Sequence, residues 1–367
     1  MPISRTRLPS LQRKLSPSDT RLTVQASATG APACCAEQPT GISQNRKGSR
    51  VAEQRGMASD LHLVITGAAG LIGSALLPRL AADGHRITRL TRGTPGPGEV
   101  SWDPARGILD LQQLGRVDGV VHLAGEAIGS RWTSARKRRI QQSRALGTSL
   151  LSQALSRLQP RPEVLISASA IGIYGDRGNE LLTEASAPGN PEHDFLVRVC
   201  LDWEAAAEPA RQAGIRVVHP RFGLVLSSEG GALAKLLPPF RLGLGGHQGH
   251  GYQWMSWIAM DDVIGAIRHA LSDRQLSGPV NVTAPGAVVN RHFTQILGRI
   301  LGRPTLLRVP AALLQLGLGE MAQRTVLASA RVQPSKLLQR GYRFEYPELE
   351  GALRHVLETE TSSSFPR

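Results

Sequence analysis

Three regularly spaced glycines are the residues of this chain whose pattern points most directly to chemistry. Gly67, Gly70 and Gly73 follow a short apolar run and precede a helical apolar pattern. A strand, a turn and a helix in this order form the context in which a glycine triplet binds the pyrophosphate of a dinucleotide. Gly67 would allow the sharp turn, Gly70 would let the backbone approach the phosphates, and Gly73 would let the helix pack closely on the sheet. The free N–H groups and the positive dipole end of the helix would then face the phosphates.

The end of the next expected strand, residues 85–91, bears on the choice of coenzyme. It ends in Thr91 and Arg92, with no carboxylate nearby. In dinucleotide-binding folds an acidic residue at this point binds the ribose 2′-hydroxyl, whereas an arginine accommodates a 2′-phosphate. The sequence therefore predicts NADP(H) in preference to NAD(H). An Arg92 side chain that only points into solvent is the alternative.

The elements that must position these residues alternate between strands and helices. Apolar runs predict strands near residues 61–66, 85–91, 100–103, 118–123, 163–167, 215–219 and 280–283. Apolar periodicity predicts helices over 134–158, 195–211, 262–271 and 290–301, and a helical tail to residue 357. Residues 230–251, which are rich in glycine, are expected to form an irregular substrate-side loop. This order predicts an α/β, Rossmann-type doubly wound, mostly parallel sheet with a smaller C-terminal α/β substrate lobe.

Charge and composition divide the chain into an N-terminal extension and a folded body. Residues 1–56 carry nine Lys or Arg and three Asp or Glu, and they lack an apolar period. We expect residues 1–57 to be a disordered basic extension, as a wrongly assigned start, a transit peptide or a nucleic-acid arm. The body would comprise an NADP-binding domain at 58–235 and a substrate lobe at 236–358, which includes the segment 309–357, followed by a disordered tail at 359–367. The expected location is cytoplasmic, or a plastid or mitochondrion if the extension is a transit peptide.

Composition also argues against several classes of protein. No run approaches the roughly 18 apolar residues of a membrane span, so no membrane contact is expected. Three cysteines, at positions 34, 35 and 200, build neither a zinc site nor a disulfide framework, and no metal is expected. The basic cluster at residues 136–139 lacks neighbouring aromatic residues, so we interpret it as a solvated helix face and expect no nucleic acid as partner.

Several motifs occur together in one order along the body. They are ITGAAGLIG at 65–73, HLAGEAI at 122–128, SRALGT at 143–148, SASAIGIYG at 167–175 and SWIAMDD at 256–262. The chain thereby resembles the atypical extended short-chain dehydrogenases/reductases known as the "epimerase family protein" group. In that group an NAD-dependent epimerase/dehydratase-like domain precedes a C-terminal domain of unknown function, which residues 309–357 resemble. The resemblance covers about residues 58–358.

The resemblance implies a set of cofactor-binding positions along one edge of the sheet. Those at the pyrophosphate are Gly67, Gly70, Leu71, Ile72 and Gly73; those at the two riboses and the nicotinamide are Thr91, Arg92, Leu123, Ala124, Arg144 and Pro220. One position departs from the pattern, because many relatives carry His where this chain has Ala259.

Catalysis in this superfamily rests on a Tyr and a Lys four residues later, whose charge lowers the Tyr pKa. No Lys of this chain has a Tyr four positions before it. By motif alignment the pair falls on Leu196 and Cys200, which we interpret as core residues of an apolar helical stripe. The remaining catalytic candidates are Ser169 and Tyr174, in the loop that follows a strand. Other polar residues that would face a substrate cleft are Glu126, Arg221, His247, His250 and Tyr252.

Two functional hypotheses follow from these observations. The first is an NADP(H)-binding, epimerase-like oxidoreductase that acts on an unknown small molecule and lacks the Tyr-x-x-x-Lys pair. The second is a non-catalytic, NADP(H)-sensing regulatory protein that binds a protein partner. A small-molecule substrate is expected under the first hypothesis, and a homodimer is one oligomeric state that we consider.

Overall fold

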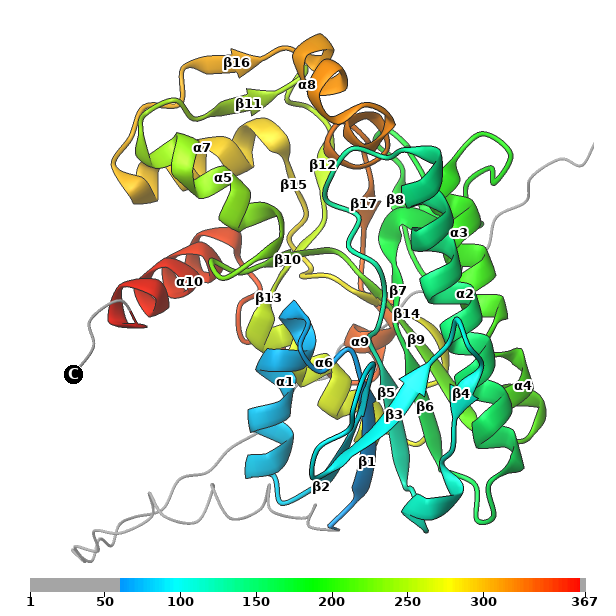
Figure 1. Cartoon of the computed structure of the whole chain (residues 1–367). Helices are drawn as coiled ribbons and strands as arrows, with labels where there is room; N and C mark the ends of the chain where they lie inside the picture. Colours follow the sequence, from blue (N-terminus) through cyan, green and yellow to red (C-terminus); the bar gives the residue numbers. More distant parts are fainter. Residues whose placement is uncertain (1–59, 364–367) are drawn as a thin grey trace, which may run out of the picture. The chain divides into compact units, whose positions relative to one another are not determined.

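A nine-stranded sheet organises the computed structural model, which describes residues 60–363 (Figure 1). In spatial order its strands are β14 (Gly278–Val282), β9 (Arg216–Phe222), β6 (Val164–Ser167), β5 (Gly119–His122), β1 (His62–Thr66), β2 (Arg86–Thr91), β3 (Glu99–Asp103) and β4 (Ile108–Leu109), with β7 (Ser169–Ala170) also paired to β9. All of these neighbours pair in parallel except β3 and β4. The mostly parallel sheet predicted from the sequence is confirmed.

Helices cover both faces of this sheet (Figure 1). On one face lie α1 (Leu71–Ala82) and α6 (Met260–Ser272); on the other lie α2 (Ser134–Arg157), α3 (Phe195–Ala205) and α4 (Glu208–Gln212). In β1, Leu63 and Ile65 join the core beneath α1 and α6, whereas Val64 joins the core beneath α2 and α4. Strands buried on both faces are apolar at successive positions, which explains why they appear as continuous apolar runs. The doubly wound Rossmann-type fold is thus confirmed.

The chain changes direction across the sheet beside β1. From β1 it passes through α1 to β2 and β3 on one side, and it then returns to β5 on the other side of β1. Ligands of open α/β sheets bind in the crevice at such a switch point, outside the carboxyl ends of the strands. A ligand site is therefore expected at the residues that follow β1 and β5.

The C-terminal half adds a smaller lobe with its own apolar core. Its helices are α5 (Gly231–Arg241), α7 (Asn290–Leu301), α8 (Ala311–Leu318) and α10 (Leu349–Ser363), and η3 (Ala322–Val326) is a π-helical turn. Helix α9 (Ser335–Gln339) instead packs on the central sheet, where Leu337 joins the core beneath α1 and α6. Its strand pairs are β10 (Leu224–Leu226) with β13 (Trp257–Ala259), β11 (Gly246–Gln248) with β16 (Leu307–Val309), β12 (Trp254–Met255) with β15 (Val288–Val289), and β17 (Arg331–Val332) with β8 (Leu181–Leu182). Two short 3-10 turns, η1 (Gln112–Leu114) and η2 (Ile171–Tyr174), complete the elements.

Three element predictions were wrong. Residues 230–251 are not one irregular loop, because α5 and β11 lie within them. Leu233, Leu237 and Phe240 recur at helical spacing in α5 and are buried in the lobe core. The helix expected over 195–211 ends at Ala205, and α4 starts anew with a proline in its first turn. The strand expected over 215–219 continues to Phe222 with Pro220 inside it.

The expected domain limits also differ from the element bounds. Helix α5 crosses the boundary that we expected between residues 235 and 236, and β14 from the second segment belongs to the central sheet. Helix α10 continues to Ser363, so the disordered tail expected from residue 359 is helical at its start. The extension expected over residues 1–57 lies outside the described residues. Among the residues that are described, no helix has the length and apolar character needed to cross a membrane.

Candidate functional site

The glycine corner between β1 and α1 is closely packed against backbone. Gly67 has a φ of 71°, and a Cβ added there would lie 2.8 Å from the amide nitrogen of Ala124. A Cβ at Gly73 would lie 2.2 Å from the carbonyl oxygen of Gly67. Both contacts are shorter than any real Cβ contact, and their partners are backbone atoms that a rotamer change cannot move. The sharp turn at Gly67 and the close packing at Gly73 therefore require glycine, as the sequence predicts.

The N-terminus of α1 is open to a ligand. Gly70 is its N-cap residue, is exposed, and has extended backbone angles (φ −80°, ψ 169°). No side chain caps the helix, and no acidic residue lies in its first turn. The first N–H groups of a helix lack intrahelical acceptors, so an anion is the partner that this arrangement fits. The corner has the backbone shape and the polarity that a pyrophosphate requires.

Thr66 holds the loop after β5 beside this corner. The amide of Ala124 donates to Thr66 Oγ1 at 3.2 Å, and the amide of Leu123 donates to the Thr66 carbonyl oxygen at 3.2 Å. Leu123 and Ala124 are half-buried. On the side of the smaller lobe, Leu71 packs against the start of α5, because a Cβ at Gly230 would lie 3.1 Å from Leu71 Cδ1. The residues predicted for the pyrophosphate and the adenosine side therefore lie together at the switch point.

Arg92 follows the end of β2 and is exposed, whereas Thr91 is half-buried. The neighbouring Arg89 pairs with Glu99 at 3.0 Å. Among residues 60–363, by contrast, no ion pair is formed by Arg92. Its guanidinium is thus accessible to an incoming phosphate.

Arg144 of α2 is held close to the same edge. Its Nη1 donates to the carbonyl oxygens of Glu126 (3.0 Å) and Ile140 (3.2 Å), and its guanidinium carbon lies 4.8 Å from the centre of the Trp203 ring. A Cβ added at Gly125 would lie 3.1 Å from the guanidinium carbon of Arg144. Burial lowers the pKa of Arg144, although Cys200 and Glu126 oppose this shift. The side chain is therefore a fixed cation beside the loop that follows β5.

A buried polar network lies beyond Arg144, where β7 and β9 end. Arg221 forms a two-pronged pair with Glu204, with Nε–Oε1 at 2.8 Å and Nη2–Oε2 at 2.9 Å. Arg221 Nη1 also donates to the Tyr174 hydroxyl at 2.9 Å. Ser169 donates to Glu204 Oε1 at 2.7 Å. Burial raises the pKa of Glu204, but the hydrogen bonds and charge of Arg221 outweigh this and hold it below its usual value.

The two catalytic candidates, Ser169 and Tyr174, are both inside this network. Ser169 is 2% exposed and Tyr174 is fully buried. The Tyr174 hydroxyl lies within hydrogen-bond distance of Asn281 Oδ1 (2.7 Å) and of the Thr183 carbonyl oxygen (3.0 Å). Burial raises the pKa of Tyr174, and the contacts with Arg221 and Asn281 offset this only in part. The structure thus brings the two candidates together, with both hydroxyls buried and hydrogen-bonded within the network.

The sequence did not reveal the Glu204–Arg221 pair. Arg221 was expected to face the substrate cleft, yet it is 5% exposed and lies inside the protein. Its partner Glu204 is four residues after Cys200, one helical turn further along α3. An acidic residue one helical turn after the buried Cys200, in line with the apolar stripe of α3, is the signal that could have identified the pair.

The positions that align with the Tyr-Lys pair are core residues, as predicted. Leu196 is 7% and Cys200 is 3% exposed, and both belong to apolar clusters of α3. Burial raises the pKa of the Cys200 thiol to about 12, with Glu204 as a second cause. At neutral pH this thiol is protonated, which argues against a nucleophilic role. Ala259, where many relatives have His, is fully buried in β13.

Pro220 lies inside β9 rather than after it, which corrects the expectation from the sequence. It is buried, and its partner in β14 is Val280. On the other side, β9 pairs with β6 up to Val218 and with β7 from Arg221 onward. Pro220 falls in the gap between these two partners, where its missing N–H interrupts no strand pairing.

A buried histidine, His122, contacts Thr66 and so supports the glycine corner between β1 and α1. Its Nδ1 lies 2.6 Å from Thr66 Oγ1 and its Nε2 lies 3.0 Å from Thr148 Oγ1. The Trp102 ring packs edge-on against the imidazole, with 5.7 Å between the ring centres. Burial, reinforced by the charge of Arg144, lowers the pKa of His122 from 6.5 to about 4. The imidazole is therefore neutral at physiological pH.

This lowered pKa predicts a loss of stability in acid. Above pH 6.5 both the folded and the unfolded chain carry a neutral His122. As the pH falls from 6.5 toward 4, only the unfolded chain takes up the proton, so the free energy of unfolding decreases, by about 3 kcal/mol in all. His219 and His269 also have lowered pKa values through burial and add to this trend.

Urea unfolding of the wild type and of His122→Gln at pH 7 and pH 5 isolates the part due to His122. We expect the stability of the variant to fall less between the two pH values than that of the wild type. Equal decreases in the two proteins would show that His122 does not titrate in this way.

The basic cluster at the start of α2 is more structured than the solvated helix face that we expected. Arg136 and Arg139 approach Glu126 at 3.7 and 3.6 Å, and Lys137 pairs with Glu320. Arg138 is exposed. The pairing also places Glu126 beside α2 instead of free in a cleft.

Two other residues that were expected to face a substrate cleft, His250 and Tyr252, stack on each other. Their ring centres are 6.2 Å apart, and Tyr252 is largely exposed.

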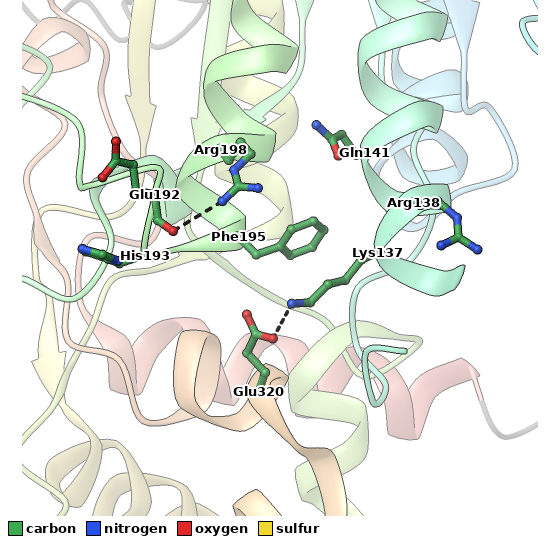
Figure 2. Close-up of a pocket in the computed structure, with 8 residues that line it drawn as sticks. All are labelled: Lys137, Arg138, Gln141, Glu192, His193, Phe195, Arg198 and Glu320. Carbon is green, nitrogen blue, oxygen red and sulfur yellow. Dashed lines mark hydrogen bonds and ion pairs between the residues drawn. The ribbon is translucent and has the colours of Figure 1, made fainter. Parts of the chain in front are cut away.

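A surface hollow of about 320 Å³ lies beside this cluster (Figure 2). Its lining residues are Lys137, Arg138, Gln141, Glu192, His193, Phe195, Arg198 and Glu320. Figure 2 shows Lys137 directed at Glu320 and Arg198 at the backbone oxygen of Glu192. Lys137 also lies 5.0 Å from the centre of the Phe195 ring. Two of the three cations are already engaged, so the glycine corner remains the stronger candidate site.

Comparison with known proteins gives consistent matches over most of the body. The model of the NAD dependent epimerase/dehydratase family matches residues 63–283, and a domain of unknown function (DUF1731) matches residues 309–356. Epimerase family protein MT2273 of Mycobacterium tuberculosis is 40% identical over 296 residues, which are 80% of this chain and 97% of that protein. The chloroplastic SDR39U1 homolog of Arabidopsis thaliana is 37% identical over 311 residues, which are 82% of this chain and 88% of that protein.

A solved structure agrees with these matches. The crystal structure of human epimerase family protein SDR39U1 (isoform 2) with NADPH has a TM-score of 0.74 and 33% sequence identity. The alignment covers 81% of this chain and 99% of the human one. The Rossmann-type body and the C-terminal segment thus match one relative together.

Proposed function

This chain belongs to the NAD dependent epimerase/dehydratase family, and we propose that it is an NADP(H)-binding, epimerase-like oxidoreductase that acts on a small molecule. The observation that carries the proposal is the uncapped N-terminus of α1 at the switch point of the sheet, with no acidic side chain in its first turn. The NADPH named in the human relative's structure supports the choice of coenzyme.

Each predicted cofactor residue has a proposed role at this edge. The N–H groups of residues 70–73 bind the pyrophosphate, with Gly67 shaping the turn and Leu71 and Ile72 at the helix start. Thr91 and Arg92 hold the 2′-phosphate, and Leu123 and Ala124 lie beside the adenosine half. Arg144 provides a fixed positive charge, and Pro220 borders the nicotinamide. When bound, the coenzyme supplies or accepts a hydride at the nicotinamide ring.

For Ser169 and Tyr174 we propose positioning roles in place of the direct catalytic roles predicted from the sequence. Proton transfer works best when the pKa of the donor lies near the operating pH. The raised pKa of Tyr174 and its three hydrogen-bond partners are unfavourable for such a transfer. The proposed reaction is therefore slow, with its proton coming from the substrate side or from water.

The second candidate is a non-catalytic NADP(H) sensor that binds a protein partner. It is favoured because the hydroxyls of Ser169 and Tyr174 are both occupied by hydrogen bonds inside the protein. Incubation of the purified protein with NADPH and a panel of aldehydes and ketones separates the two. Oxidation of NADPH that depends on the carbonyl compound, followed at 340 nm, is the result expected of an oxidoreductase. Tight NADPH binding without turnover, together with a co-purifying protein, would favour the sensor.

The role of Arg92 predicts a selective loss of affinity. We expect Arg92→Ala to weaken NADPH binding by about 10- to 100-fold, since a charge-assisted contact to a phosphate contributes about 1.5–3 kcal/mol. NADH, which lacks the 2′-phosphate, should bind the variant as it binds the wild type. Calorimetric titration of each protein with both coenzymes measures the effect.

Arg89→Ala is the matched control for this experiment, because Arg89 lies in the strand that ends just before Arg92 but pairs with Glu99. It should leave the ratio of the two affinities unchanged. If Arg92→Ala weakened both coenzymes equally, Arg92 would not be the residue that reads the 2′-phosphate.

Three further expectations stay predictions. They are a homodimer, a cytoplasmic location, and an organellar location if residues 1–56 act as a transit peptide. Gel filtration with light scattering measures the first, and imaging of the full chain fused to a fluorescent protein measures the other two.

A further inference from the structure

The smaller lobe carries an unusual set of exposed leucines, which we call the leucine face. Its members are Leu242, Leu244, Leu306, Leu307, Leu313 and Leu316, which are between 48% and 92% exposed. Single exposed leucines are common on protein surfaces, but several together mark an interaction site.

Three chain segments bring these leucines together. Leu242 and Leu244 precede β11, which pairs with β16 so that Gly246 lies opposite Leu307. A Cβ at Gly243 would lie 4.0 Å from Pro304, and one at Gly249 would lie 4.0 Å from the Cβ of Ala311 at the start of α8. Figure 1 shows β11, β16 and α8 grouped at the same end of the lobe. The segments that carry the leucine face therefore lie next to one another at this end of the lobe.

Helix α8 is the clearest part of this surface. Its sequence, AALLQLGL, is almost wholly apolar, yet none of its residues is buried. The helix is nonetheless fixed at its C-terminal end, because Arg131 Nη1 donates to the Leu316 carbonyl oxygen at 3.0 Å and Lys137 pairs with Glu320. These two contacts fix the position of the helix, so its leucines stay on the outside of the protein.

The segments that carry the leucine face contain basic residues but no acidic ones. Residues 230–260 and 274–319, which include all six leucines, contain no Asp or Glu. Arg303 and Arg308 are exposed within the same segments, and Arg131 is exposed beside α8. Glu320, which follows these segments, is paired with Lys137. Exposed leucines with arginines beside them are complementary to a partner that is both apolar and negatively charged.

We propose that the leucine face docks on the surface of an anionic lipid bilayer. Apolar side chains of a surface helix insert at the boundary between headgroups and acyl chains, and nearby Arg residues are attracted to anionic headgroups. Eight residues of helix span about 12 Å, so α8 lies on the bilayer and does not cross it. This inference is independent of the coenzyme site. It replaces the expectation of no membrane contact, which rested on a search for spanning runs.

Sedimentation of the full chain with lipid vesicles tests the proposal. We expect binding to vesicles of phosphatidylcholine with about one third phosphatidylglycerol, weaker binding at high salt, and little binding to phosphatidylcholine alone. The double variant Leu313→Glu with Leu316→Glu should lose at least about tenfold in partitioning. Leu146→Glu, in α2, is the matched control because Leu146 is a helical leucine that is 50% exposed outside this face.

A second variant removes charge without touching the leucines. Arg303→Gln with Arg308→Gln should weaken binding to anionic vesicles several-fold and reduce its salt dependence. Circular dichroism and NADPH binding serve as checks that each variant folds. The proposal is overturned if the wild type ignores both kinds of vesicle or binds them equally. It is also overturned if light scattering shows a dimer that only the Leu313/Leu316 variant dissociates, because a second copy would then cover the face.

Discussion

Gly73→Ala is expected to abolish measurable NADPH binding, with a loss of more than about 100-fold in affinity. The added Cβ would lie 2.2 Å from the Gly67 carbonyl oxygen and 2.9 Å from the Ala68 Cα. Because both are backbone atoms, the variant relieves the contact only by moving the loop or the start of α1. Either movement disrupts the group of N–H donors that the pyrophosphate needs. Calorimetric titration with NADPH measures the loss.

Gly351→Ala is the matched control, since nothing lies within 4 Å of a Cβ built there in α10. It should bind NADPH as the wild type does. Thermal unfolding of both variants distinguishes a distorted corner from a failure to fold. A well-folded Gly73→Ala protein with wild-type affinity would show that this corner does not hold the coenzyme.

Glu204→Ala is expected to cause the largest loss of stability among the substitutions considered. It removes the carboxylate that pairs through two hydrogen bonds with Arg221, which is 5% exposed. Breaking a buried pair by removing one partner costs about 3–5 kcal/mol, because the remaining charge stays buried without compensation. The midpoint of thermal unfolding should fall by about 5–8 °C for a folded body of this size. Differential scanning calorimetry measures this directly.

Two comparisons separate the buried charge from other effects. Glu208→Ala removes an exposed carboxylate that pairs with Arg211 just beyond α3, and its effect should be far smaller. Combining Glu204→Leu with Arg221→Met removes both charges and should recover part of the lost stability. A Glu204→Ala protein as stable as Glu208→Ala would contradict the view that this pair is buried and structural.

The sequence predicted the part of the site that depends on local backbone geometry. Gly67 and Gly73 had to be glycine because a turn and a close helix approach are encoded within a few residues. The apolar runs of β1, β5 and β6 predicted buried parallel strands, which the structure confirms. Helix α7 has the bounds expected from its periodicity, residues 290–301.

Features that depend on distant contacts were missed. Glycines around α5 hid its apolar stripe, although Leu233, Leu237 and Phe240 have helical spacing. The network of Glu204, Arg221 and Tyr174 joins a helix, a strand and a turn. Contacts between such distant segments cannot be predicted from a local sequence pattern. Exposure of the leucine face was equally hidden, because an apolar helix is normally expected to be buried.

The most direct test of the account is a calorimetric titration of the wild-type protein with NADPH and, separately, with NADH. We expect one saturable site with higher affinity for NADPH than for NADH. Absence of heat with either coenzyme, confirmed by the absence of thermal stabilisation at millimolar concentration, would contradict it.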